Sequence, residues 1–389
     1  MKSFLRRQNY LALAILALLV ITASTPIYWH RIMTPVDGDY GTHILYTYQL
    51  LKREYIPSHI LSHPAVQIIL GGLVWASRSH VQPERGMVGL MVASNVLLAL
   101  TVYFWLGEAL KAWKRVLLGF TLPFLAPVMA LAPLDNHYYY GYIGLANYHN
   151  PTIQLLRPVA LLVFILALQV FRRPRNPAWM IIVSAVLVIF SALIKPNYIL
   201  CALPAMAILG LILLLRRQPF DVRMGLLGFA LPAAVVLAAQ WYVTYAMPGA
   251  DNSHIIFLPL AVEQYFSNYL PWKFLLSILF PLAVLLLTAR RTVRDRSLQL
   301  AWLSFVIGAL QLYLLAEGGD RLYDANFRWS AQITLFVLIA ACVRFIAAQL
   351  TVEKKISLRQ KLVAYGVYGL QLAAGVVYYV YCFISAHYG

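Results

Sequence analysis

Two aspartates separated by one glycine, Asp37 and Asp39, follow the first long apolar segment of the chain. Carboxylates this close to a bilayer cost free energy unless they are paired, solvated in a cavity or bound to a cation. Such a pair could act as a general base, ligate a metal ion, or do both. The alternative is a solvated turn outside the membrane, because Asp-Gly is a common turn dipeptide.

Several histidines gather in the same polar stretches of the sequence. His43 lies four residues after Asp39, so the two share one face if a helix begins by Asp39. The other polar candidates there are His59, His63, His137, His149 and Asn150. Without HxH or HExxH spacing they are a weak zinc signal. We interpret them as hydrogen-bonding or proton-shuttling groups that contact a substrate in a polar cavity.

A lone lysine, Lys195, stands before Pro196 between two apolar runs. It either extends its charge to the membrane interface or binds an anion, for which a phosphate is the natural ligand. The proline ends a helix and frees backbone groups, as happens where a membrane helix lines a cavity. Lys195 is therefore a candidate phosphate ligand.

The segment 317–329 is dense in charge for its length. Its arginines, Arg321 and Arg328, could clamp a phosphate by bidentate hydrogen bonds. The alternative is a loop closed by internal ion pairs to its own acids. The polar residues of this segment are Glu317, Asp320, Arg321, Asp324, Asn326 and Arg328.

The composition is that of a membrane protein. Of the 389 residues 61% are hydrophobic and 12% charged, and the mean hydropathy is +0.72. Soluble domains rarely exceed about half apolar. The net charge of +17 is read as an orientation signal, not as a nucleic-acid footprint. We therefore expect an all-α polytopic bundle, one membrane domain over 1–389 with no separate soluble domain.

Apolar stretches long enough to span a bilayer number about eleven. They are 10–28, 86–106, 116–133, 152–171, 178–194, 198–215, 224–246, 272–289, 298–316, 331–349 and 362–385. A further stretch, 65–76, is too short to span easily and is predicted to be re-entrant or interfacial.

Basic residues set the predicted orientation. If 65–76 does not span, most Lys and Arg fall on one side, which makes the N-terminus cytoplasmic and the C-terminus external. The external loops are then 29–85, 134–151, 195–198, 247–271 and 317–330, and they hold the candidate residues. In the first of them, 40–53 reads as an amphipathic helix that would form a rim at the membrane surface.

This pattern resembles the GT-C superfamily of integral-membrane glycosyltransferases. The matching features are Asp37-Gly38-Asp39 after the first span, two interfacial helices in the next loop, His63-Pro64, and Lys195-Pro196. The resemblance implies inverting transfer from a polyprenyl-phosphate-linked sugar to a glycan, lipid or protein acceptor. The site would face the periplasmic side of an inner or plasma membrane, in glycan biosynthesis for the cell envelope. One of the two aspartates would be the catalytic base.

The chemistry of the residues agrees with that expectation. Lys195, with Arg321 or Arg328, would stabilise the leaving phosphate, while Asp39, with Asp37 as partner, takes the acceptor proton. The two aspartates could also bind Mg²⁺ or Mn²⁺, although a cationic side chain can neutralise the phosphate instead. The main alternative is a transporter or lipid flippase, because intramembrane charges and broken helices fit that class too.

Overall fold

The protein is an all-α helical bundle, as the composition predicts. The computed structural model describes residues 2–34, 36, 38–78, 80–108, 110–145, 148–247, 254–348 and 357–387. Within these ranges, eight helices are long and apolar enough to cross a membrane, or nine if a bent pair counts as one span. The chain is therefore a multi-pass membrane protein.

Most of the eight candidate spans are single continuous helices. They are α1 (Lys2–Met33), α5 (Pro83–Leu106), α8 (Pro151–Arg172), α10 (Asn197–Leu215), α16 (Arg296–Leu314), α17 (Arg328–Ala348), which follows the short helix η4 (Gly319–Asp324), and α18 (Leu358–Ile384). One span is a run of α- and π-helical pieces: α11 (Val222–Met224), η2 (Gly225–Ala230), α12 (Leu231–Trp241) and η3 (Tyr242–Ala246). Of the candidate spans, α17 and α8 are the most buried and form the centre of the bundle.

Three of the eleven expected spans are not single membrane-spanning helices in the structure. α9 (Ala178–Ile194) is a shorter apolar helix, and α14 (Leu270–Ser277) meets α15 (Leu279–Thr292) at a bend of 67°. The stretch 116–133 is not one helix. α6 (Ala112–Thr121) passes into a single 3₁₀ turn, η1 (Leu122–Phe124), and then into irregular chain.

Prolines explain the break after α6. Pro123 and Pro127 have no backbone N–H, so an α-helix cannot continue through them without losing hydrogen bonds. Neighbouring helices satisfy the freed backbone: Ala126 N–H donates to the Gln371 carbonyl at 3.2 Å, and Val128 N–H to that of Leu276 at 3.4 Å. Irregular backbone at membrane depth is tolerated only when protein groups pair it in this way.

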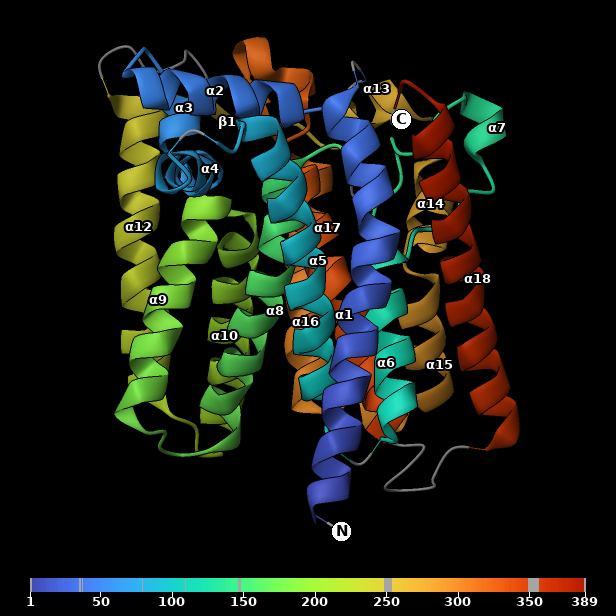
Figure 1. Cartoon of the computed structure of the whole chain (residues 1–389). Helices are drawn as coiled ribbons and strands as arrows, with labels where there is room; N and C mark the ends of the chain where they lie inside the picture. Colours follow the sequence, from blue (N-terminus) through green and yellow to red (C-terminus); the bar gives the residue numbers. More distant parts are fainter. Residues whose placement is uncertain are drawn as a thin grey trace.

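Short helices after α1 lie across one end of the bundle, called the loop end below (Figure 1). They are α2 (Tyr40–Lys52), α3 (Ser58–Leu61) and α4 (Ala65–Ala76). Figure 1 shows α4 end-on while the spans run lengthwise, in agreement with the predicted interfacial or re-entrant helix. α2 buries Tyr40, His43, Ile44 and Thr47, the i, i+3, i+4, i+7 spacing of an amphipathic helix.

The loop end also carries the C-terminus, whereas the N-terminus lies at the opposite end, called the basic end below (Figure 1). A two-stranded antiparallel sheet at the loop end pairs β1 (His254–Phe257) with β2 (Leu315–Gly318). Two more short helices, α7 (Ala132–Asp135) and α13 (Ala261–Phe266), lie there as well. Termini at opposite ends fit an odd number of crossings.

Candidate functional site

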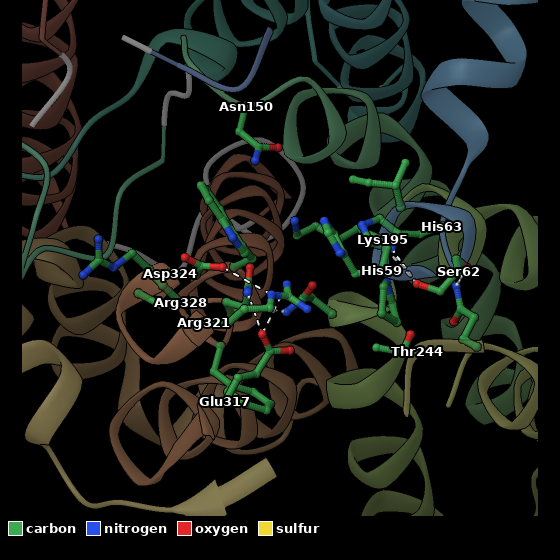
Figure 2. Close-up of a pocket in the computed structure, with 18 of the residues that line it drawn as sticks. His59, Ser62, His63, Asn150, Lys195, Thr244, Glu317, Arg321, Asp324 and Arg328 are labelled. Atoms are coloured by element: carbon green, nitrogen blue, oxygen red, sulfur yellow. Dashed lines mark hydrogen bonds and ion pairs between the residues drawn. The ribbon is translucent and has the colours of Figure 1, made fainter. Parts of the chain in front are cut away.

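A cavity of about 800 Å³ opens at the loop end of the bundle. Its walls come from α2, the turn after α3, the segment that precedes α8, the α9–α10 junction, α12 with η3, and the segment from β2 to the start of α17. In Figure 2, His59, His63 and Lys195 lie on one side and Glu317, Arg321 and Asp324 on the other. These elements are far apart in the sequence, so only the folded chain forms the site.

The structure gathers nearly all of the predicted site residues around this cavity. Those that line it are Asp39, His43, His59, His63, His149, Asn150, Lys195, Glu317, Arg321, Asp324, Asn326 and Arg328. Asp37 lies outside the described residues. His137 does not line the cavity. Its backbone N–H donates to Asp135 Oδ1 at 3.3 Å, in the turn after α7, and its ring packs edge-on against Tyr140.

Backbone contacts fix Asp39 against the segment before α8. Its N–H donates to the His149 carbonyl at 2.7 Å, and its own carbonyl accepts the His43 N–H at 3.0 Å as α2 begins. The preceding Gly38 has φ +149°, and a Cβ there would lie 3.2 Å from the His149 carbonyl oxygen. A larger residue at position 38 would therefore meet both strain and a close backbone contact.

The Asp39 carboxylate accepts a hydrogen bond from the Asn150 side-chain amide. Asn150 is the N-cap of α8, because its Oδ1 accepts from Ile153 N–H at 3.0 Å and from Thr152 Oγ1 at 2.6 Å. With that oxygen engaged by two donors, the NH₂ group must point at Asp39. Helix capping thus determines which end of the amide faces the carboxylate.

Thr152 continues this chain of hydrogen bonds to Lys195. The Lys195 Nζ donates to Thr152 Oγ1 at 3.4 Å, and that hydroxyl donates in turn to Asn150. Thr152 was not among the predicted site residues. Its position, two residues after an asparagine that begins an apolar helix, is the signal that could have pointed to it.

Lys195 brings a buried positive charge to the cavity. It is buried, lies between α9 and α10 next to Pro196, and is 5.1 Å from the centroid of the Trp329 ring. Within the described part of the chain, no carboxylate lies within 4 Å of its ammonium. Burial lowers the pKa of Lys195 to about 8, and the nearby Asp39 opposes that shift.

The two predicted arginines are instead paired with carboxylates. Arg328 forms a buried fork with Glu263 on α13, with contacts of 2.8 to 3.1 Å. Arg321 contacts Glu317 at 3.2 Å and Asp324 at 3.3 Å. Arg321 therefore follows the alternative given for the segment 317–329, an ion pair to the segment's own acids. Arg328 instead pairs with an acid outside the segment, Glu263. The charge of both arginines is largely compensated before any ligand arrives.

Side-chain hydrogen bonds hold Glu317 in place at the cavity. A second acid of this region, Glu263, was not among the predicted site residues. Asn326 Nδ2 donates to Glu317 Oε2 at 2.8 Å, and the Tyr245 hydroxyl donates to Oε1 at 3.3 Å. Glu263 sits in an aromatic context with no motif around it, so its pairing with Arg328, 65 positions later, has no sequence signal. These carboxylates and arginines thus form a polar network along one side of the cavity before any ligand binds.

Three buried histidines of the cavity, His43, His63 and His149, have lowered pKa values that favour the neutral imidazole. Burial is the main cause that lowers the pKa of His43, to about 3, with Lys195 and His59 adding to the effect. Burial also holds the pKa values of His63 and His149 well below the usual range. His43 Nδ1 pairs with Gln67 Nε2 at 2.7 Å, and His63 Nδ1 with Ser62 Oγ at 3.0 Å. These imidazoles can offer hydrogen bonds without adding charge.

The Asp39 carboxylate is the acidic counterpart of Lys195. Burial raises the pKa of Asp39, while Lys195 and the Asn150 hydrogen bond oppose the rise. Among the described residues, no group of three His, Cys, Asp or Glu is arranged to hold a metal ion. The predicted metal pair includes Asp37, which lies outside the described residues, so the metal site stays a prediction.

Comparison of the chain with models of known protein families finds no match. A comparison with curated proteins finds no match either. Any functional conclusion therefore depends on the residue pattern and on the geometry of the cavity.

Proposed function

We propose that the protein is a membrane glycosyltransferase of the GT-C kind. It transfers a sugar from a polyprenyl-phosphate-linked donor to an acceptor at the loop end of the bundle. One observation carries the proposal: the Lys195 ammonium, which forms no ion pair among the described residues, shares one cavity with the Asp39 carboxylate and is joined to it through Thr152 and Asn150. An anion site and a base within one cavity are what transfer from a lipid phosphate requires.

Lys195 is the group that binds the donor phosphate. The leaving group carries more negative charge in the transition state than in the bound donor, so a fixed cation beside it lowers the barrier. Arg328 and Arg321 are already paired and contribute less. The cavity volume of about 800 Å³ is within the usual range of roughly 300–1,000 Å³ for small-molecule sites.

Asp39 is the proposed base. Its raised pKa makes the carboxylate a better proton acceptor, and the Asn150 amide keeps the ionised form available. It takes the proton of the acceptor hydroxyl while the new C–O bond forms and the bond to the phosphate breaks. Inversion follows if the base and the phosphate lie on opposite faces of the sugar, as in inverting glycosidases. Asp37 is its predicted partner.

The apolar side of the cavity suits a lipid-linked donor. Leu200 from α10 and Leu237 and Trp241 from α12 line it, and Trp241 is exposed. An isoprenoid chain in the bilayer could pass along this side while its phosphate meets Lys195. The basic helix ends at the opposite end of the bundle fit a cytoplasmic N-terminus and an external active site.

A transporter or flippase is the second candidate. The bend between α14 and α15 favours it, because transporters often use broken helices. Transporter sites usually lie near the middle of the membrane, whereas the polar cavity here is at one end of the bundle. The transferase is the better account of that position.

A binding experiment tests the proposed role of Lys195 in holding the donor phosphate. Donor affinity is measured in detergent or nanodiscs with a polyprenyl-phosphate sugar, for the native protein and for Lys195→Met. Lys52→Met, at the exposed end of α2, is the matched control because it removes the same charge from the same end. We expect donor affinity to fall only in Lys195→Met. Equal affinity in both variants would contradict the phosphate role.

A further inference from the structure

A second groove, independent of the proposed function, lies at the basic end of the bundle. It has a volume of about 340 Å³ and lies between α6, α15, α17 and α18. The three helices α6, α15 and α18 run side by side there in Figure 1. Leu117, Leu118, Phe280 and Ile346 supply much of its wall, and Lys114 is its one charged lining residue.

The groove offers almost nothing to water. Apart from Lys114, its polar side-chain groups are the hydroxyls of Tyr365 and Tyr368 and the indole of Trp113. The Tyr368 hydroxyl is already hydrogen-bonded to Thr121 at 2.7 Å. Apolar cavities of this kind stay dry and take apolar ligands. Because α17 and α18 are candidate membrane spans, the apolar group at hand is a lipid hydrocarbon chain.

Charge at the groove selects among lipids. The Lys114 ammonium lies 5.5 Å from the centroid of the Trp113 ring, and Trp113 is exposed, as interfacial tryptophans are. In the described part of the chain no carboxylate pairs with Lys114. Lys111 at the N-cap of α6 and Lys361 in the first turn of α18 add positive charge at the same end.

We infer that this groove is a binding site for one anionic phospholipid. An acyl chain fills the space between α6 and α18, and the headgroup phosphate meets Lys114. The lipid would join the N-terminal part of α6 to α17 and α18. Because it binds the folded state, it also stabilises the fold by mass action.

The first test compares lipids on the purified full chain. After delipidation in mild detergent, phosphatidylglycerol or phosphatidylcholine is added back, and retained lipid is counted by native mass spectrometry. We expect phosphatidylglycerol to be retained and to raise the unfolding temperature more than phosphatidylcholine does. No retained lipid, or equal retention of the two, would overturn the assignment.

Variants then localise the site. Lys114→Ala is expected to lower phosphatidylglycerol retention roughly fivefold, the factor typical of one basic residue at a lipid surface. Arg173→Ala is the matched control, because it removes an exposed charge at the same end but away from the groove. Ala347→Leu and Ala364→Leu narrow the groove from two different helices. Retention equal to that of the native protein in a folded narrowed variant, or equal loss in Arg173→Ala, would overturn the proposal.

Discussion

Asn150 is predicted to set the pH range in which Asp39 is ionised. Its Oδ1 caps α8, and its Nδ2 donates to the carboxylate. Different substitutions separate these two roles. Asn150→Ser keeps a capping oxygen but loses the amide donor, Asn150→Ala loses both, and Asn150→Asp keeps the cap while placing a second carboxylate against Asp39.

The size of each effect follows from the kind of hydrogen bond that is lost. A hydrogen bond to a charged group contributes about 1.5–3 kcal/mol. Loss of the hydrogen bond lowers the ionised fraction of Asp39 roughly 10- to 150-fold at acid pH. In that range the rate of sugar transfer depends on how much of Asp39 is ionised. Loss of the cap costs about 1 kcal/mol of folding stability and applies to Asn150→Ala alone.

The assay is a pH–rate profile for sugar transfer, with thermal unfolding measured on the same samples. We expect the acid limb to move to higher pH in Asn150→Ser at nearly native stability. Asn150→Ala should show the same move with lower stability, and Asn150→Asp a larger move because of like-charge repulsion. An Asn150→Ser profile that falls evenly at all pH values, with no moved limb, would refute the coupling to Asp39.

Three more predictions follow from charges at the loop end. Donor affinity should fall as pH rises through about 8, where Lys195 loses its proton, and Lys195→Arg should keep affinity to higher pH; a flat native profile argues against this. Burial raises the pKa of Asp39 in the folded state. The protonated carboxyl therefore stabilises the fold at acid pH, and this stabilisation is lost as pH rises through the pKa of the folded state. Asp39→Asn should therefore gain unfolding temperature over the native protein at neutral pH more than at acid pH, and the reverse order would contradict it. Arg328→Met should cost about 3–5 kcal/mol by leaving Glu263 unpaired, and adding Glu263→Leu should restore most of it in thermal unfolding; an equally unstable double variant would be inconsistent with the pairing.

The helical architecture could be predicted from apolar runs because segment length against bilayer thickness is a simple physical constraint. Eight of the eleven expected spans are single candidate spans in the structure. The exception at 116–133 was predictable in part, since Pro123 and Pro127 stand in the sequence. Hydropathy does not depend on whether a residue has a backbone N–H. The prediction from hydropathy therefore missed the helix break at these prolines.

The residue types of the candidate site, and their gathering at one end of the bundle, could be predicted, but the pairs that they form could not. Placing the polar loops on one side brought Asp39 and Lys195 into consideration together. Nothing in the sequence tells that Asn150, 111 positions after Asp39, donates to its carboxylate, or that Glu263 takes the charge of Arg328. Such contacts depend on how loops pack across the bundle end, and no local pattern encodes them.

The central claim is that Asp39 serves as the base in transfer from a lipid-phosphate sugar. The most direct measurement reconstitutes the native protein and Asp39→Asn in liposomes with labelled polyprenyl-phosphate sugars and follows release of the polyprenyl phosphate and the configuration of the product. We predict transfer with inversion by the native protein and a loss of roughly 10²–10⁴-fold in Asp39→Asn, the usual contribution of a general base. Transfer at the native rate by a folded Asp39→Asn variant would contradict the account.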